Sequence, residues 1–168
     1  MSSAPTTPLQ VFRFLVEFQQ VSINPSSAAK NVMLCQGAFA ECTGLEATTE
    51  VKAIKEGGRN YGVAQRAGNT TFATVILKRG IGMADLWTVF NTVATKAFAV
   101  RLQVNITVFK ADGTGALAWK LDNAIPIKYK FADLNAKGTE IGIEELHLAH
   151  EGLGVGTVAS SLQGGTHA

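Results

Sequence analysis

The residue types best suited to metal or acid–base chemistry gather near the end of the sequence, where His147, His150 and Glu151 form an H-x-x-H-E string. Imidazole nitrogens and a carboxylate are common zinc ligands. The surrounding residues are rich in β formers, however, and residues three apart in a strand point to opposite faces. The two imidazoles would converge on one ion only if a bulge ran through them. The string therefore favours a surface or interface role over metal binding.

The other candidate constellations are better explained as structure. The run from Gly113 to Ala118 matches a relaxed G-x-G-x-x-A dinucleotide pattern, but it lies between two predicted strands, which favours a β-turn. Glu144 and Glu145 are adjacent, so in a strand their carboxylates diverge and cannot share a substrate. No G-x-S-x-G elbow, phosphate-binding G-x-x-x-x-G-K or C-x-x-C pair occurs. The sequence thus predicts no enzyme, no cofactor and no metal.

The two cysteines, Cys35 and Cys42, flank the segment QGAFAE. In an extended chain this separation holds their Cα atoms too far apart for a disulfide. We expect two reduced, buried thiols.

The elements that position these residues are mostly strands. From Arg101 to Val108 apolar and polar residues alternate strictly, which predicts a strand with one buried face. The segment Val11 to Val21 shows the same period. Further strands are predicted at Thr71 to Lys78, Leu117 to Leu121, Ile125 to Phe131 and Glu140 to His150. In the last of these, Ile141 and Ile143 fall out of step with Leu146 and Leu148, which predicts a β-bulge near Glu144 and Glu145 or burial on both faces.

One segment has helical spacing. Within a helix predicted over residues 83–95, the side chains of Leu86, Trp87, Phe90 and Val93 share one side. Gly80 and Gly82 end the strand before it. We expect a single helix that packs this side into the core or closes a barrel end, in preference to a coenzyme-binding helix. The fold class predicted is mainly β, a barrel or sandwich of antiparallel strands with one flanking helix.

A long polar segment from Glu46 to Asn69 contains few large apolar residues. Ordering it would cost entropy that a compact monomer does not recover, and long loops of this kind usually serve a function. We expect an exposed hairpin arm that meets a partner. The residues after Gly152 are small and polar, so we expect one domain over 1–153 and a flexible tail over 154–168.

Composition narrows the classes of protein. The 168 residues are 46% hydrophobic, which fits one domain, and 17% charged with a formal net charge of +2. That charge disfavours nucleic acid as the primary partner. No apolar run is long enough to span a membrane, and the start MSSAPTTPLQ lacks the order of a secretory signal. We expect a soluble chain made in the cytoplasm.

Six runs, in order along nearly the whole chain, resemble the phage tail tube protein family. They are Phe39 to Glu46, Glu56 to Asn60, Leu77 to Gly80, Trp119, Asn123 to Lys128 and Glu144 to Leu153. The family builds the inner tubes of contractile phage tails, tailocins and contractile injection systems, and the haemolysin-coregulated protein of type VI secretion is a more distant likeness. The segment 23–32 and the Gly-rich tail depart from the family pattern.

The resemblance implies a structural subunit of a small β-barrel fold that forms hexameric rings. The rings stack into a rigid hollow tube that sheath contraction propels. Implied partners are further copies of the chain, the sheath, baseplate or spike and tube-terminating proteins, and protein cargo or DNA in the lumen. The implied location is a phage tail or tail-like particle assembled in, anchored to or released from a bacterial cell. The inter-ring arm would present Lys52, Lys55, Glu56, Arg59, Asn60, Tyr61 and Arg66.

Two other functions stay open at this point. A ring-forming carrier, like the type VI relatives, would bind and protect cargo proteins in its lumen. A monomeric barrel for a small ligand is less favoured, because it has no use for a long polar arm.

Overall fold

The structure is a computed structural model that describes residues 13–22, 32–82, 85–96 and 100–156. Strand β7 (Val100–Phe109) shows how alternating apolar and polar residues give a strand one buried and one exposed face. Its alternate residues, from Val100 to Val108, are buried, and those between them are half-exposed. The strict alternation in its sequence gives this strand one apolar face, and that face lies on the core.

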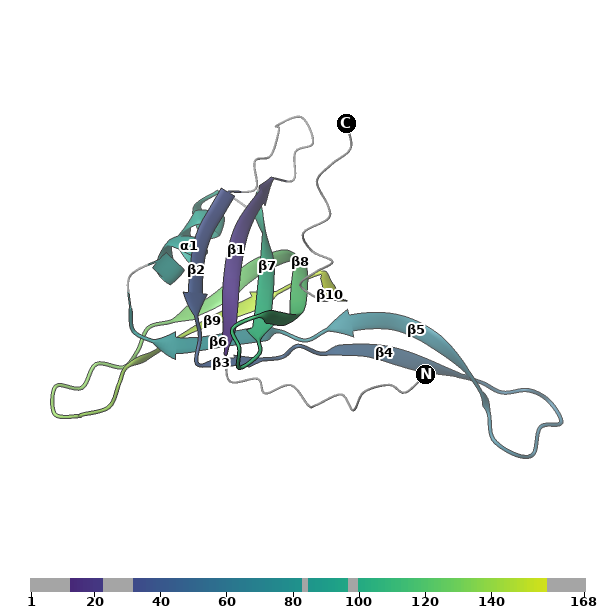
Figure 1. The fold of residues 1–168 in the computed structure, drawn as a ribbon. Coiled ribbons are helices and arrows are strands. Elements are labelled where there is room, and N and C mark those ends of the chain that lie inside the picture. Colours follow the sequence, from purple (N-terminus) through teal and green to yellow (C-terminus); the bar gives the residue numbers. More distant parts are fainter. Residues whose placement is uncertain (1–12, 23–31, 83–84, 97–99, 157–168) are drawn as a thin grey trace, which may run out of the picture.

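Two sheets share one long strand. The front sheet contains β2 (Val32–Ala38), β1 (Phe14–Ser22), β7, β8 (Gly115–Lys130) and β10 (Gly152–Gly156), in that order. The back sheet contains β8, β9 (Ile143–Ala149), β6 (Val75–Gly80) and β3 (Glu41–Thr43). All neighbours are antiparallel. Figure 1 looks onto the front sheet, with β9, β6 and β3 behind and below it.

Strand β8 turns the corner between the sheets. Its first part pairs with β7 and β10, and its last part, from Ile125 on, pairs with β9. Asn123 stands at the change of partner with a φ of 51°, in the left-handed region that asparagine tolerates better than most residues. The strands predicted at Leu117 to Leu121 and Ile125 to Phe131 are therefore one bent strand.

Other predicted boundaries also change. The segment Thr71 to Lys78 is divided between two strands, because the chain leaves one hairpin and enters the back sheet at residues 73–74. The strand expected from Glu140 starts only at Ile143. The first strand is confirmed over Phe14–Ser22, whereas residues 11–12 lie outside the described residues. Strands β2 and β3 had not been predicted.

The bulge expected in β9 is wrong. Its pairing with β6 runs without a shift from Val75 opposite Leu148 to Gly80 opposite Ile143. Glu144 keeps step with Leu146 and Leu148 and points inward, while Ile143 is half-exposed. The irregularity lies in the partner strand β8, between Pro126 and Lys128.

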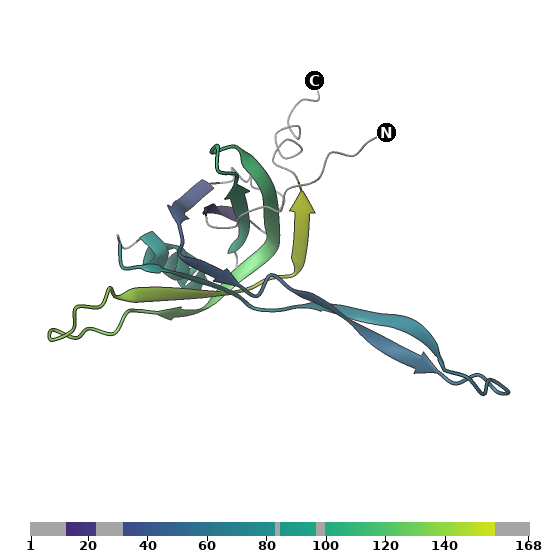
Figure 2. The same ribbon diagram turned by 60° about the horizontal axis from the view of Figure 1, so that its bottom comes forward.

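The predicted arm is a hairpin of β4 (Ala47–Ile54) and β5 (Ala64–Phe72), joined by residues 55–63. We keep the name arm for this hairpin. It projects away from the two sheets in both views (Figures 1 and 2). Opposite Glu50, β5 carries two residues, Gly68 and Asn69, so the arm contains a β-bulge. Every residue of β4 is exposed.

Helix α1 (Asp85–Thr95) lies within the predicted span, and residues 83–84 are outside the described residues. It packs against β8 and β2. Leu86, Val89 and Val93 are its buried residues, and Phe90 is partly buried. Trp87 is 39% exposed, so the expectation that it belongs to the core is wrong. Val89, which had not been predicted, takes its place.

The C-terminal boundary moves as well. Gly154, Val155 and Gly156 had been assigned to a flexible tail, but they pair with Lys120, Trp119 and Ala118 in the front sheet. Residues 157–168, and residues 23–31 of the segment that departs from the family pattern, lie outside the described residues.

Candidate functional site

The histidines at the end of β9 do not converge. His147 Nε2 lies 3.4 Å from a carboxylate oxygen of Glu145, on the outer face of the back sheet. The His150 ring lies 5.3 Å, centroid to centroid, from Phe72 at the base of the arm, and its Nδ1 bonds to the carbonyl oxygen of Gly152 at 3.0 Å. Within the described part of the chain, no three His, Cys, Asp or Glu side chains are placed to hold a metal ion.

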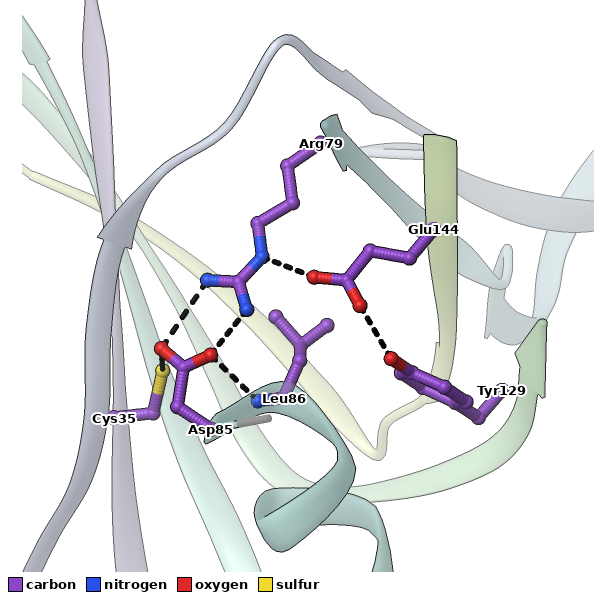
Figure 3. Close-up of polar contacts among 6 residues, drawn as sticks. All are labelled: Cys35, Arg79, Asp85, Leu86, Tyr129 and Glu144. Carbon is purple, nitrogen blue, oxygen red and sulfur yellow. Dashed lines mark hydrogen bonds and ion pairs between the residues drawn. The ribbon is translucent and has the colours of Figure 1, made fainter. Parts of the chain in front are cut away.

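A buried charge cluster fastens helix α1 to the two sheets (Figure 3). Arg79 of β6 donates through Nε to Glu144 of β9, and through its two terminal nitrogens to both carboxylate oxygens of Asp85. Tyr129 of β8 donates its hydroxyl to the second oxygen of Glu144. The Cys35 thiol of β2 donates to Asp85 at 3.2 Å. Asp85 also accepts the Leu86 backbone N–H at 3.0 Å, at the start of the helix.

These contacts determine the charge states in the cluster. Burial alone would lower the pKa of Arg79, but its bonds to Asp85 and Glu144 outweigh burial and raise it. The same guanidinium lowers the pKa of Asp85 to about 2. Burial, and then the bond to Glu144, raises the pKa of the Tyr129 hydroxyl. Arg79 is thus positively charged and Asp85 negatively charged at neutral pH, and their ion pair holds the helix to the back sheet.

The expectation of reduced thiols is confirmed. Cys35 is buried and Cys42 is partly buried, and neither is in a disulfide. Burial, with the neighbouring Asp85 second, raises the pKa of Cys35 to about 12, and burial raises that of Cys42 to about 11. Both thiols stay protonated at neutral pH, which makes them poor nucleophiles.

The seven predicted arm residues all lie on the exposed hairpin. Lys52 is in β4 and Arg66 is its direct cross-strand neighbour in β5. Like charges directly opposite each other destabilise a strand pair. The other five lie in the connection 55–63, where Arg59 pairs with Glu56 at 3.1 Å and Tyr61 is 94% exposed. The arm therefore displays cationic and aromatic groups on an exposed surface.

Trp87 belongs to an aromatic patch instead of the core. Its ring lies between 5.4 and 5.6 Å, centroid to centroid, from the rings of Phe90, Tyr129 and Phe131. Phe131 is 60% exposed. The patch spans the helix and the end of β8, and it borders an apolar groove of about 360 Å³ that Ile81 and Leu134 also line.

The outer faces of the two sheets differ in charge. Across the back sheet, Glu41, Lys78, Glu145 and Lys130 stand side by side on successive strands, so charge alternates along the row. Lys78 pairs with Glu41 at 3.2 Å. Across the front sheet, the corresponding row contains Gln36, Glu17, Asn105 and Lys120, in which amides separate the charges.

The charge cluster was not predicted because its members, apart from Arg79 and Asp85, are far apart in sequence. One local signal was present. Val75 and Leu77 point inward on β6, and the period of two places the Arg79 side chain on the same face. An arginine at a core-facing position requires buried acceptors, and Glu144, out of step with the isoleucines beside it, is one of them.

Comparisons with known proteins place the chain in context. Residues 10–154 match the family model of the T4-like virus tail tube protein gp19. None of the curated proteins matches. A chain of the six-fold symmetrised anti-feeding prophage (AFP) baseplate is 25% identical with a TM-score of 0.74, and the match covers 91% of this chain and 98% of that one.

Two more solved structures share the fold. A chain of the sheath–tube complex of the extracellular contractile injection system PVC, in the extended state, has a TM-score of 0.72 and 18% identity over 94% of this chain and 100% of that one. An Hcp protein has a TM-score of 0.51 and 12% identity over 88% of this chain and 92% of that one.

Proposed function

This chain belongs to the family of the T4-like virus tail tube protein gp19, and we propose that it closes into six-membered rings that stack into the inner tube of a contractile tail or injection system. The match spans most of the chain, and the AFP relative comes from a six-fold symmetrised particle. Head-to-tail contacts between identical subunits close a ring by rotation, whereas ring-on-ring contacts stay open and extend a filament. Further copies, a sheath, a baseplate and a terminator are the partners that this role requires.

The arm is the observation that carries the proposal. All eight residues of β4 are exposed, and the hairpin projects beyond the body of the subunit. An isolated two-stranded hairpin is marginal in water. We assign the arm to the contact between successive rings, where a neighbour covers Lys52, Arg66, Tyr61 and the residues between them.

The test removes the arm from Lys52 to Arg66. Val51 and Ala67 face each other across the hairpin, so an Asn-Gly turn can join them. We expect a subunit with unchanged circular dichroism that forms rings but no tubes in negative-stain electron micrographs. The control variant, Lys52→Gln with Arg66→Gln, keeps the length of the arm and removes its two opposed charges. A deletion variant that unfolds, or that still forms tubes, would contradict this role for the arm.

The same micrographs address the ring-forming carrier. A carrier of that kind predicts separate rings at every concentration, whereas a tube subunit predicts stacks that lengthen as concentration rises.

No helix in the described residues is long and apolar enough to cross a membrane.

A further inference from the structure

We propose that the end of the subunit opposite the arm is the surface on which the arm of a second copy, in the next ring, docks. The inference rests on the proposed tube function and deepens it, because it names the surface that receives the arm. We call this surface the apolar end and define it by five exposed apolar residues: Ile81, Trp87, Phe131, Leu134 and Ile141.

The arm and the apolar end lie on opposite sides of the molecule. The connection between β8 and β9, residues 131–142, extends beyond the ends of these strands, on the side away from the arm in both views (Figures 1 and 2). The eight residues of β4 span about 27 Å, so the arm reaches well beyond its own subunit. A contact that extends a filament joins two different surfaces of the same chain. Opposite ends of one subunit meet this requirement.

The apolar end has the composition of a protein contact. Its five side chains are between 39% and 91% exposed. The rings of Trp87 and Phe131 lie 5.4 Å apart, centroid to centroid, and both border the groove of about 360 Å³ that Ile81 and Leu134 also line. Ile141 lies beside them, because the backbone N–H of Ile81 donates to the carbonyl oxygen of the residue that follows Ile141. Adjoining exposed apolar side chains of this kind mark a surface that another protein covers.

The arm offers a face that fits such a surface. Beyond its bulge, the period of two places small, uncharged side chains on one face of the hairpin and both cations of the strands on the other. The uncharged face would lose little hydration energy when it is covered by apolar groups. Its cross-strand pairs are Val51 with Ala67 and Ala53 with Gln65, and those of the other face are Lys52 with Arg66 and Ile54 with Ala64.

Charge also matches between the arm and the connection 131–142. Residues 47–72 carry four basic and two acidic side chains, whereas residues 131–142 carry two acidic and one basic, and all of them are exposed. Lys52 and Arg66 repel each other across the hairpin, and carboxylates of a neighbour would relieve this repulsion. Asp133 and Glu140 are the carboxylates of the connection. Docking therefore brings apolar groups together and places cations beside anions.

The first experiment asks whether the arm and the apolar end meet. Val51→Cys and Leu134→Cys are made as separate variants, and because both side chains are exposed we expect both to fold. Tubes assembled from an equal mixture are treated with a short bismaleimide and analysed by denaturing electrophoresis. We expect cross-linked dimers from the mixture. Tubes of either variant alone should give only the wild-type background from Cys35 and Cys42.

A control mixture replaces Leu134→Cys with Val155→Cys, whose side chain is 62% exposed on β10, and it should give no dimers above background. Labelling of Leu134→Cys by a water-soluble maleimide should also be slower in tubes than in dissociated subunits. Equal labelling rates would mean that the apolar end faces solvent or a different partner such as a sheath, and would overturn the inference. Dimers from the control mixture alone would overturn it as well.

The second experiment tests the charge match. Lys52→Glu with Arg66→Glu should raise the protein concentration needed for tubes at least about tenfold, because carboxylates then face carboxylates. Asp133→Lys with Glu140→Lys should do the same. All four changes in one chain should restore tubes at the wild-type concentration, with circular dichroism unchanged throughout. If the two pairs of changes impair tubes and their combination does not restore them, the charges do not meet.

Micrographs of the wild type separate the two levels of the proposal. Wild-type tubes that give no dimers between arm and apolar end contradict this inference and leave the tube function standing. A wild-type protein that forms no tubes contradicts the proposed function itself.

Discussion

Strands β7 and β4 are the same kind of element in opposite surroundings. In β7 every second residue is buried, whereas in β4 all eight residues are exposed. A strand in the body of the subunit is held by its apolar face as well as by its ladder. The exposed strand β4 is held by its ladder and by exposed side-chain contacts such as that between the Thr49 and Thr70 hydroxyls. If the arm makes the proposed contact between rings, folding and assembly use separate parts of this sequence. Substitutions in the body should change the free energy of unfolding, and substitutions in the arm should change assembly.

The largest effect on stability is expected at the charge cluster. Arg79→Gln leaves Glu144, which is 5% exposed, without its cationic partner. Removing one member of a buried ion pair typically lowers the free energy of unfolding by about 3 to 5 kcal/mol. Urea denaturation measures the change. The matched control is Lys78→Gln, the preceding residue on the opposite face, whose exposed pair with Glu41 should contribute less than about 1 kcal/mol. Equal losses in both variants would contradict the distinction.

The same cluster predicts how stability depends on pH. Arg79 lowers the pKa of Asp85 in the folded state from its ordinary 3.8 to about 2. The stability that this shift contributes is complete above about pH 4 and is lost as pH falls through about 2. Unfolding free energies measured across this window should fall less steeply in Arg79→Gln than in the wild type. Parallel curves would show that Asp85 does not depend on Arg79.

The core supplies the next largest effect. Leu121 is fully buried in β8, between β7 and β10. Leu121→Ala should lower the free energy of unfolding by about 2 to 5 kcal/mol, because it removes buried methyl groups and leaves a cavity. Leu134→Ala is the control, since Leu134 is 91% exposed and its truncation should stay within about 0.5 kcal/mol. Thermal and urea unfolding of both variants tests the contrast.

A smaller effect is expected at Trp87. Its partial exposure reduces the free energy lost on truncation, and its ring contacts with Phe90, Tyr129 and Phe131 account for most of what remains. Trp87→Ala should lower the free energy of unfolding by about 1 to 2 kcal/mol. Val89→Ala tests the revised helix face, because Val89 is fully buried and a cavity there should destabilise the subunit more. A larger loss of unfolding free energy in Trp87→Ala than in Val89→Ala would show that Trp87 belongs to the core.

The smallest effect on stability belongs to the arm. Val51 is 58% exposed in β4, so Val51→Ser should change the free energy of unfolding by less than about 0.5 kcal/mol. If a neighbouring ring covers this side chain, the same variant should form fewer or shorter tubes in micrographs. If Val51→Ser lowered the free energy of unfolding and left tube length unchanged, the arm would contribute to folding and not to assembly, contrary to the proposed role.

The elements predicted best from the sequence were those whose local pattern of apolar and polar residues fits only one type of secondary structure. Strand β7 alternates strictly, and it was found within one residue of its predicted ends. The arm was evident from its polar length. Helix α1 was predicted, but its apolar residues are spread over a wide arc of the helix surface, so periodicity could not identify the buried side. These residues are Leu86, Trp87, Val89, Phe90 and Val93. The contacts of Asp85 with Arg79 and Cys35 orient the helix, and the contact with Cys35 joins residues 50 positions apart in the sequence.

The corner in β8 could not be predicted for a related reason. Asn123, flanked by Asp122, resembles a turn signal, and two short strands were the simplest interpretation. The chain continues as a strand because β10 and β9 occupy successive parts of the same edge. Neither pairing has a signature within the residues of β8 itself.

That corner has a mechanical consequence. Because the sixteen residues of β8 belong to both sheets, the sheets are joined by an unbroken line of peptide bonds as well as by packed side chains. A load that pushes one sheet along its plane reaches the other through covalent bonds, and sliding would require the hydrogen bonds on both sides of β8 to break together. The two sheets should therefore resist such a load as one rigid unit, and the first contacts to break should be those of an edge strand, β2, β3 or β10, with its single described neighbour.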